Sequence, residues 1–362
     1  MTTVATTPGV QPPKAARKRP SGGGLGRYIL IRFLLIFPTI FILVTMVFLL
    51  MRTTGDPITA ALGDRLGAEA LAERVHAAGY DRPIIVQYFE YLAQIFTGNF
   101  GTTISTGRPV FEILTKYGPA TAELAFYSLL VAFIIGIPFG MVAAYFRDKA
   151  PDAFFRVFAI LCYATPVFFA GLLLKLIFSV WLKWLPASGR ASTGVELQMQ
   201  FLPSQTGFYT IDALRLSDPL VALGDVLQHA VLPAIALGLL TAGVFLRLVR
   251  TNVIGTLSTD YVDAARSRGV SEFRLVRKHA YRPALIPIIT VIGLQIALLL
   301  GGAVLTETTF EWKGLGFMLT QFLLARDFVA VQGIVALLAV IVALTNFIVD
   351  IIAALIDPRV RY

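Results

Sequence analysis

Six long apolar stretches constrain the fold of this chain more than any other feature. Each has about 20 or more residues, the length at which a helix crosses a hydrocarbon core about 30 Å thick. They are apolar on all sides, so they are expected to face lipid or one another. The stretches are Ile29–Met51, Thr121–Tyr145, Phe154–Trp181, His229–Val249, Ala284–Thr306 and Val329–Ile356. The sequence therefore predicts an all-α polytopic membrane protein with six transmembrane helices.

The composition excludes a water-soluble core and a disordered chain. Only 15% of the residues are charged and 56% are apolar, with a mean hydropathy of +0.74. A soluble domain has about 25% charged residues, and disorder requires low hydrophobicity. Cys162 is the one cysteine, which excludes a disulfide framework within the chain and a multi-cysteine metal site. We predict no metal site and no catalytic residues.

The distribution of charge predicts how the spans are oriented. The net charge is +9, and Lys and Arg exceed Asp and Glu on only one side of the predicted spans. That basic side consists of residues 1–27, 146–153, 250–283 and 357–362; the other side consists of 52–120, 182–228 and 307–328. Basic loops stay in the cytoplasm, so both termini are expected there. Topology and anionic membrane lipid account for the charge, and no nucleic-acid partner is needed.

The sequence divides into a short tail and one long domain. Residues 1–27 are rich in proline, glycine and basic residues, a composition typical of a disordered basic cytoplasmic tail. Residues 28–362 form the predicted transmembrane domain. Its long outer loop, 52–120, contains a helical pattern at 84–96 with an apolar face and a polar face that carries Gln87, Glu90 and Gln94. Such a helix lies on the membrane surface or packs against the bundle.

The cytoplasmic loop 250–283 is predicted to hold two short helices. The first runs from Asp260 to Arg268, is capped by Ser258 or Thr259, and ends at Gly269. The second runs from Glu272 to Ala280 and is expected to stop before Pro283.

The first of these helices has a composition that suits a protein contact. It carries the small residues Ala264 and Ala265 beside the aromatic Tyr261, and a helix of this kind can lie in a groove on another protein. The alternative is an ordinary basic loop that lies against lipid headgroups.

This loop also carries a recognisable motif. It reads D-A-A-x3-G, then nine residues, then His, then Pro, at Asp263, Ala264, Ala265, Gly269, His279 and Pro287. The motif resembles the EAA loop of binding-protein-dependent ABC-transporter permeases, with Asp263 in place of the leading Glu. Further segments resemble the dipeptide/oligopeptide branch, which includes nickel permeases: GDPI at 55–58, WLPASG at 184–189 and HAVLPAIALG at 229–238.

The resemblance implies a fold and a role. The fold would be a type I ABC importer permease-like bundle, multi-pass in the bacterial cytoplasmic membrane. The chain would be a non-catalytic permease subunit and form half of a pathway for peptides. Its partners would be a second homologous permease, two cytoplasmic ATPase subunits and an extracytoplasmic substrate-binding protein.

The resemblance also implies which residues couple the chain to the ATPases. They would be Asp260, Tyr261, Asp263, Ala264, Ala265, Gly269 and His279. The chain has no G-x4-GK[ST] phosphate loop, so we expect no cofactor in it, with ATP and Mg²⁺ bound by the partners.

Alternatives for the function remain open at this point. The solute could be nickel or another small molecule, since nothing in the spans specifies a peptide. A stand-alone secondary transporter or channel would need coupling-ion ligands, a filter motif or internal repeats, and no such pattern is evident. Gln295 and Asn346 are candidates to line the pathway, because amides inside a membrane need polar partners.

Several other residues within the spans invite either a structural or a functional interpretation. Lys175 is expected to extend its ammonium group to the outer surface, Glu123 to lie at the interface, and Asp350 to pair with Arg359 or Arg361. Gly136 and Gly140 form a GxxxG pair, which can pack within this chain or against a second permease.

Overall fold

Most of the part of the chain that the structure describes is helical. This computed structural model describes residues 25–53 and 55–356, apart from a few side chains in the fifth and sixth predicted spans. The first six helices are α1 Leu25–Arg52, α2 Pro57–Leu62, α3 Ala68–Ala77, α4 Ile84–Phe96, α5 Val110–Tyr145 and α6 Ala150–Ala164. The following helices are α7 Val167–Leu174, η1 Lys175–Trp181, α8 Thr193–Gln200, α9 Tyr209–Ala213 and α10 Pro219–Leu257. The remaining ones are α11 Asp260–Ser267, α12 Glu272–Arg274, η2 Leu275–Ala280, α13 Tyr281–Phe310, α14 Leu315–Leu324 and α15 Phe328–Ile356.

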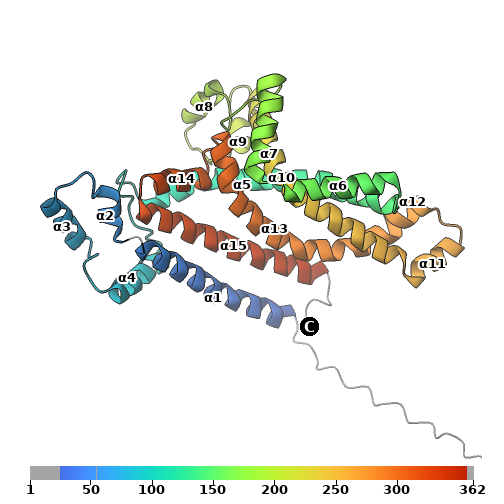
Figure 1. The fold of residues 1–362 in the computed structure, drawn as a ribbon, viewed down its shortest axis with the longest axis horizontal. Helices are drawn as coiled ribbons and strands as arrows, with labels where there is room; N and C mark the ends of the chain where they lie inside the picture. Colours follow the sequence, from blue (N-terminus) through green and yellow to red (C-terminus); the bar gives the residue numbers. More distant parts are fainter. Residues whose placement is uncertain (1–24, 54, 357–362) are drawn as a thin grey trace, which may run out of the picture.

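The predicted spans correspond to five long helices and one broken pair. The five are α1, α5, α10, α13 and α15, each of which contains an apolar stretch long enough to cross a membrane. The third predicted span, Phe154–Trp181, is not one straight helix. There α6 and the α7–η1 segment meet at an angle of 106°, and α7 turns away from the bundle (Figure 1). The cause is local, because Pro166 cannot continue the helix and Thr165 before it is extended, with ψ 123°.

The contact between α5 and α10 forms the centre of the bundle. A Cβ atom added at Gly136 would lie 2.8 Å from Phe245 Cβ, and one added at Gly140 would lie 2.7 Å from Val249 Cβ. Both glycines are buried, so they let the two backbones approach closely. The GxxxG pair therefore packs within this chain, which decides between the two alternatives that the sequence left open.

The connecting segments collect at opposite ends of the long helices. In Figure 1, α2, α3 and α4 lie near the C-terminal end of α1, while α11 and α12 lie near the C-terminal end of α10. The turn between α5 and α6 meets the second group, because Arg250 of α10 pairs with Asp152 at the start of α6. Residues 146–153 and 250–283 thus share an end, as the charge pattern predicted. The assignment of that end to the cytoplasm, with both termini, stays a prediction.

The tail and the domain boundary need one adjustment. Helix α1 begins at Leu25, so residues 25–27 belong to the first span. The predicted disorder of the tail concerns residues that lie, apart from these three, outside the described part of the chain. Arg359 and Arg361 also lie outside it.

Three charged side chains in the spans have partners that the sequence did not indicate. Lys175 Nζ does not reach the outer surface but donates to the carbonyl of Thr309, 3.0 Å away. Glu123 is buried rather than exposed, because its side chain is only 4% exposed and pairs with Arg190. Asp350 pairs with Arg32 of α1 at 3.2 Å, across the α1–α15 contact. Each charge is satisfied by a neighbouring helix or loop that is distant in sequence.

Candidate functional site

The helix α11 forms much as the sequence predicts. It ends one residue earlier than predicted, and Gly269 has φ +81°, the left-handed conformation that favours glycine. The Gly269 amide donates to the carbonyl of Arg266 at 2.9 Å, and the Val270 amide donates to that of Ala265 at 3.3 Å. These two bonds make a Schellman turn, which satisfies the last carbonyls of the helix.

The predicted N-terminal cap of α11 is only half right. Thr259 occupies the N-cap position, but its side chain makes no hydrogen bond to the helix amides. Its hydroxyl instead donates to the carbonyl of Thr256, 2.6 Å away. Thr259 therefore closes the end of α10 rather than the start of α11.

The sequence predicted that the second loop helix stops before Pro283, but the structure shows that it continues. It starts as α12, continues as η2, and runs directly into α13. Pro283 lies in the first turn of α13 and has no amide hydrogen for the carbonyl of His279, four residues earlier. That carbonyl accepts a hydrogen bond from the Tyr261 hydroxyl at 3.2 Å. The proline is tolerated there, and Tyr261 joins α11 to the base of α13.

Further contacts hold α11 against the bundle by one face. Val262 is completely buried, and so are Leu275 and Ala280 of η2. Arg266 forms ion pairs with Asp263 on α11 and with Glu272 on α12, the second with Nε 2.6 Å from Oε1. Val262 and Glu272 were not recognised from the sequence as residues that anchor α11. For Val262 a signal was available, because it is a branched apolar side chain in a largely polar helix.

The residues predicted to couple to ATPases, here called the coupling face, lie on and around α11, and two of them, Tyr261 and Asp263, also take part in the contacts that hold this helix. Exposed members of this coupling face are Asp260, Tyr261, Asp263, Ala264 and Gly269, whereas Ala265 and His279 are half-buried. A rigidly held short helix with exposed small residues can fit closely into a groove on another protein. The geometry thus agrees with the chemistry that the sequence indicated, and the role of these residues stays a prediction.

A buried ion pair between α6 and α10 was not anticipated. Asp152 has no exposed surface, and Arg250 Nε lies 2.5 Å from its Oδ1, with Nη2 2.7 Å from Oδ2. The amide of Asp148 also donates to Asp152, at 3.0 Å. Asp152 therefore joins the α5–α6 turn to α10. A lone carboxylate at the start of an apolar helix was the signal that could have indicated it.

We expect Asp152→Asn to destabilise this end of the bundle by about 2 kcal/mol, because a buried charge-assisted pair is lost while the size of the side chain is kept. Thermal unfolding of the purified protein would measure the change. The matched control is Asp263→Asn, whose side chain is 61% exposed and whose ion pair should matter little. Equal melting temperatures for the two variants would contradict the structural role of Asp152.

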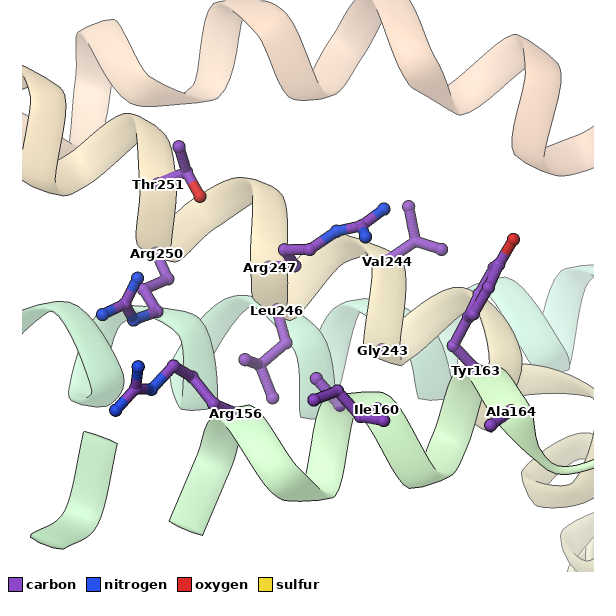
Figure 2. Close-up of a pocket in the computed structure, with 11 residues that line it drawn as sticks. Arg156, Ile160, Tyr163, Ala164, Gly243, Val244, Leu246, Arg247, Arg250 and Thr251 are labelled. Carbon is purple, nitrogen blue, oxygen red and sulfur yellow. The ribbon is translucent and has the colours of Figure 1, made fainter. Parts of the chain in front are cut away.

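A cavity of about 390 Å³ lies between α6 and α10, next to this ion pair. Figure 2 shows Arg156 and Arg250 at one end of it, and Tyr163 with Ala164 at the other. Its walls between these ends are mostly apolar, with Ile160, Val244 and Leu246 among the lining residues. The cavity is thus mostly apolar, with arginine side chains at the end next to the Arg250–Asp152 pair.

The two residues predicted to line a pathway occupy different surroundings. Gln295 is only 4% exposed, so it faces the interior of this chain. Asn346 is half-buried, and its Oδ1 lies 3.1 Å from the position of a Cβ atom built on Gly293, within the α13–α15 contact. Their role in a pathway stays a prediction.

Comparison with known families decides the class of protein. The family described as "Binding-protein-dependent transport system inner membrane component" matches residues 136–362, and its N-terminal counterpart matches residues 25–125. The chain belongs to this family of permeases. It is accordingly a multi-pass component of the inner membrane, which confirms the predicted localisation and the resemblance drawn from the loop motif.

Curated relatives place the permease in the dipeptide/oligopeptide branch. A di/tripeptide transport system permease protein from Pseudomonas aeruginosa is 39% identical over 92% of this chain and 98% of its own length. A probable D,D-dipeptide transport system permease protein from Escherichia coli is also 39% identical, over 84% and 88%. A glutathione transport system permease protein from Salmonella typhimurium is 34% identical, over 92% and 99%.

A solved structure supports the fold of the permease. The MetNI methionine ABC transporter, in an inward-facing conformation, has a chain that matches with a TM-score of 0.50 and 16% identity. The match covers 68% of the permease and 96% of that chain. The predicted all-α bundle of an ABC importer is therefore confirmed at the level of the fold.

Proposed function

We propose that this permease forms half of a pathway for short peptides across the cytoplasmic membrane. The support is that relatives matching nearly its whole length are named for dipeptides, tripeptides or glutathione. A second homologous permease would complete the pathway, and an extracytoplasmic substrate-binding protein would deliver the peptide. Within it, Gln295 and Asn346 would contribute polar groups near the middle of the membrane.

We further propose that the coupling face of α11 docks on a cytoplasmic ATPase subunit. Two such subunits would bind ATP and Mg²⁺, and the permease itself would catalyse nothing. The observation that carries this proposal is that the buried Val262 and the Tyr261–His279 bond hold α11 on the bundle while most of the coupling residues stay exposed. A helix held in this way moves with the bundle, so displacement of the ATPases would tilt α10 and α13 as rigid bodies.

Nickel or another solute remains the alternative cargo, because the residues of the cytoplasmic loop 250–283 do not specify which solute is transported. A stand-alone secondary transporter or channel has less support, because the family to which the chain belongs works with a binding protein.

Co-purification tests the proposed coupling. The tagged permease, expressed with its full set of partners, is expected to bring down a second permease and ATPase subunits. Replacing residues 260–269 by a Gly/Ser segment should remove the ATPases and keep the second permease. The matched control replaces α3, which has the same length and no buried residue, and should keep both. The proposal is wrong if the wild type purifies alone in mild detergent, or if the 260–269 variant retains the ATPases.

A further inference from the structure

A second cavity, of about 280 Å³, lies at the other end of the molecule. It is enclosed by the last residue of α1, the polar face of α4, the segment 99–104 and the start of α15. Figure 1 shows α2 and α4 gathered at this end of α1. The polar face that the sequence indicated on α4, Gln87, Glu90 and Gln94, lines this cavity, while apolar residues of the same helix such as Ile85 and Phe96 are exposed.

Buried polar atoms without partners are concentrated around this cavity. Four of its lining residues contribute them: Arg52 through Nε and Nη1, Gln87 through Oε1, Tyr91 through its hydroxyl and Gln332 through Nε2. None of these atoms has a hydrogen-bond partner within the described part of the chain. Gln87 and Gln332 are more than nine-tenths buried, at 7% and 6% exposed. Leaving such atoms unpaired is costly, so the cavity is built for a polar occupant.

The orientation of Gln87 is determined by its neighbours. Its Nε2 donates to the carbonyl of Tyr80 at 3.0 Å and to that of Arg82 at 2.7 Å. Its Oε1 is therefore the acceptor left over. Burial raises the pKa of the Tyr91 hydroxyl well above its usual value, so this group keeps its proton and can donate.

The charge in the cavity favours an acceptor-rich occupant. Arg52 lies between two aromatic rings, 5.0 Å from the centre of Phe48 and 4.7 Å from that of Tyr80. No salt bridge to Arg52 is found among the described residues, and the nearby Glu90 is paired with Arg82 at 2.6 Å. The guanidinium, the Gln332 amide and the Tyr91 hydroxyl all offer hydrogens. Such a donor set matches a carboxylate, to which arginine donates in parallel.

We propose that this outer cavity binds the carboxylate group of a small solute, held by Arg52, Gln332 and Tyr91. A water molecule takes about 30 Å³, so the space admits a solute of roughly dipeptide size. Gln87 Oε1 is a buried acceptor without a partner among the described residues and would face a donor on the same solute. The site is separate from the coupling face and does not depend on the peptide as cargo.

Equilibrium binding to the purified transporter in lipid nanodiscs, without ATP, tests the site. The probes are labelled dialanine, which has a carboxylate and an ammonium group, labelled succinate, which has carboxylates only, and inorganic phosphate. Arg52→Met should weaken carboxylate binding by at least about tenfold, the loss of one charge-assisted contact. Gln332→Glu keeps the size of the side chain and adds a negative charge to the cavity lining, so it should abolish carboxylate binding. The matched control is Arg65→Met, an exposed arginine of the same outer segment, which should bind as the wild type does.

Each outcome bears on the proposal. A carboxylate site is supported if dialanine, succinate or both bind to the wild type and this binding is lost in Arg52→Met and Gln332→Glu. Comparing dialanine with succinate then shows whether the ammonium group also contributes to binding. Binding of phosphate alone overturns it, as does carboxylate binding unchanged in either variant. Absence of binding by every probe also overturns it and leaves a hydrated structural cavity.

Discussion

Replacing Arg190 with Ala is expected to free the outer segment 182–213 from the bundle and to cost about 3–5 kcal/mol of stability. The side chains of Arg190 and Glu123 are 5% and 4% exposed, and Nη2 lies 2.5 Å from Oε2. Removal of the arginine would leave Glu123 as a buried, unpaired charge. The expected readout is loss of amide hydrogen-exchange protection in 189–213, while α10 and α13 stay protected.

The size of this effect follows from how many groups the pair holds together. Glu123 Oε1 accepts from the amide of Thr210 at 2.8 Å, and Arg190 donates to the carbonyl of Gly207 at 2.9 Å. The guanidinium also lies 3.6 Å from the centre of the Tyr209 ring. The pair thus joins α5 to the loop that contains α9, so one substitution releases several contacts at once.

Two further variants make the Arg190 prediction specific. Arg215→Ala removes a more exposed arginine from the same segment, 38% exposed, and should cost less than about 1 kcal/mol. The double variant Glu123→Gln, Arg190→Met removes both charges and should recover part of the protection, because the main penalty is the unpaired charge. Full protection of 189–213 in Arg190→Ala would show that the pair does not hold the segment.

Ala265→Trp is expected to abolish transport and leave the permease folded. Ala265 is half-buried on the coupling face, next to the exposed Ala264, and an indole there would keep α11 out of a close-fitting groove. A loss of about 2 kcal/mol at the centre of an interface corresponds to about thirtyfold weaker docking. Uptake of labelled dipeptide by reconstituted vesicles should fall accordingly, whereas ATP hydrolysis by the ATPase subunits should no longer respond to the binding protein.

The control for this variant is the same substitution in α3. Ala70→Trp introduces an indole on an exposed position at the opposite end of the molecule and should transport normally. The melting temperature of Ala265→Trp should match that of the wild type, since the Schellman turn at Gly269 uses backbone groups only. Normal uptake by Ala265→Trp would remove the coupling role from α11.

Local features of this protein could be predicted from its sequence. The lengths of the apolar stretches indicated the spans, because the thickness of a bilayer sets a minimum length for each helix. Gly269 ended α11 as predicted, because only glycine adopts a positive φ at that position without strain. The loop motif indicated the family correctly. Phe154–Trp181 was read as one stretch, without the sharp bend at Pro166, although the cause of that bend is equally local, since a proline restricts the residue before it.

Pairings between distant residues were decided by the tertiary structure. Glu123 is 67 residues from Arg190 and Arg250 is 98 from Asp152, and no periodicity relates such positions. The Gly136–Gly140 pair was compatible with two partners, and only the position of α10 showed which one it contacts. The polar face of α4 turned inward onto a cavity to which α1, α2, α15 and two connecting segments also contribute. Helix propensity, capping and hydropathy act over a few residues, whereas these contacts depend on which helices pack together and in what rotation.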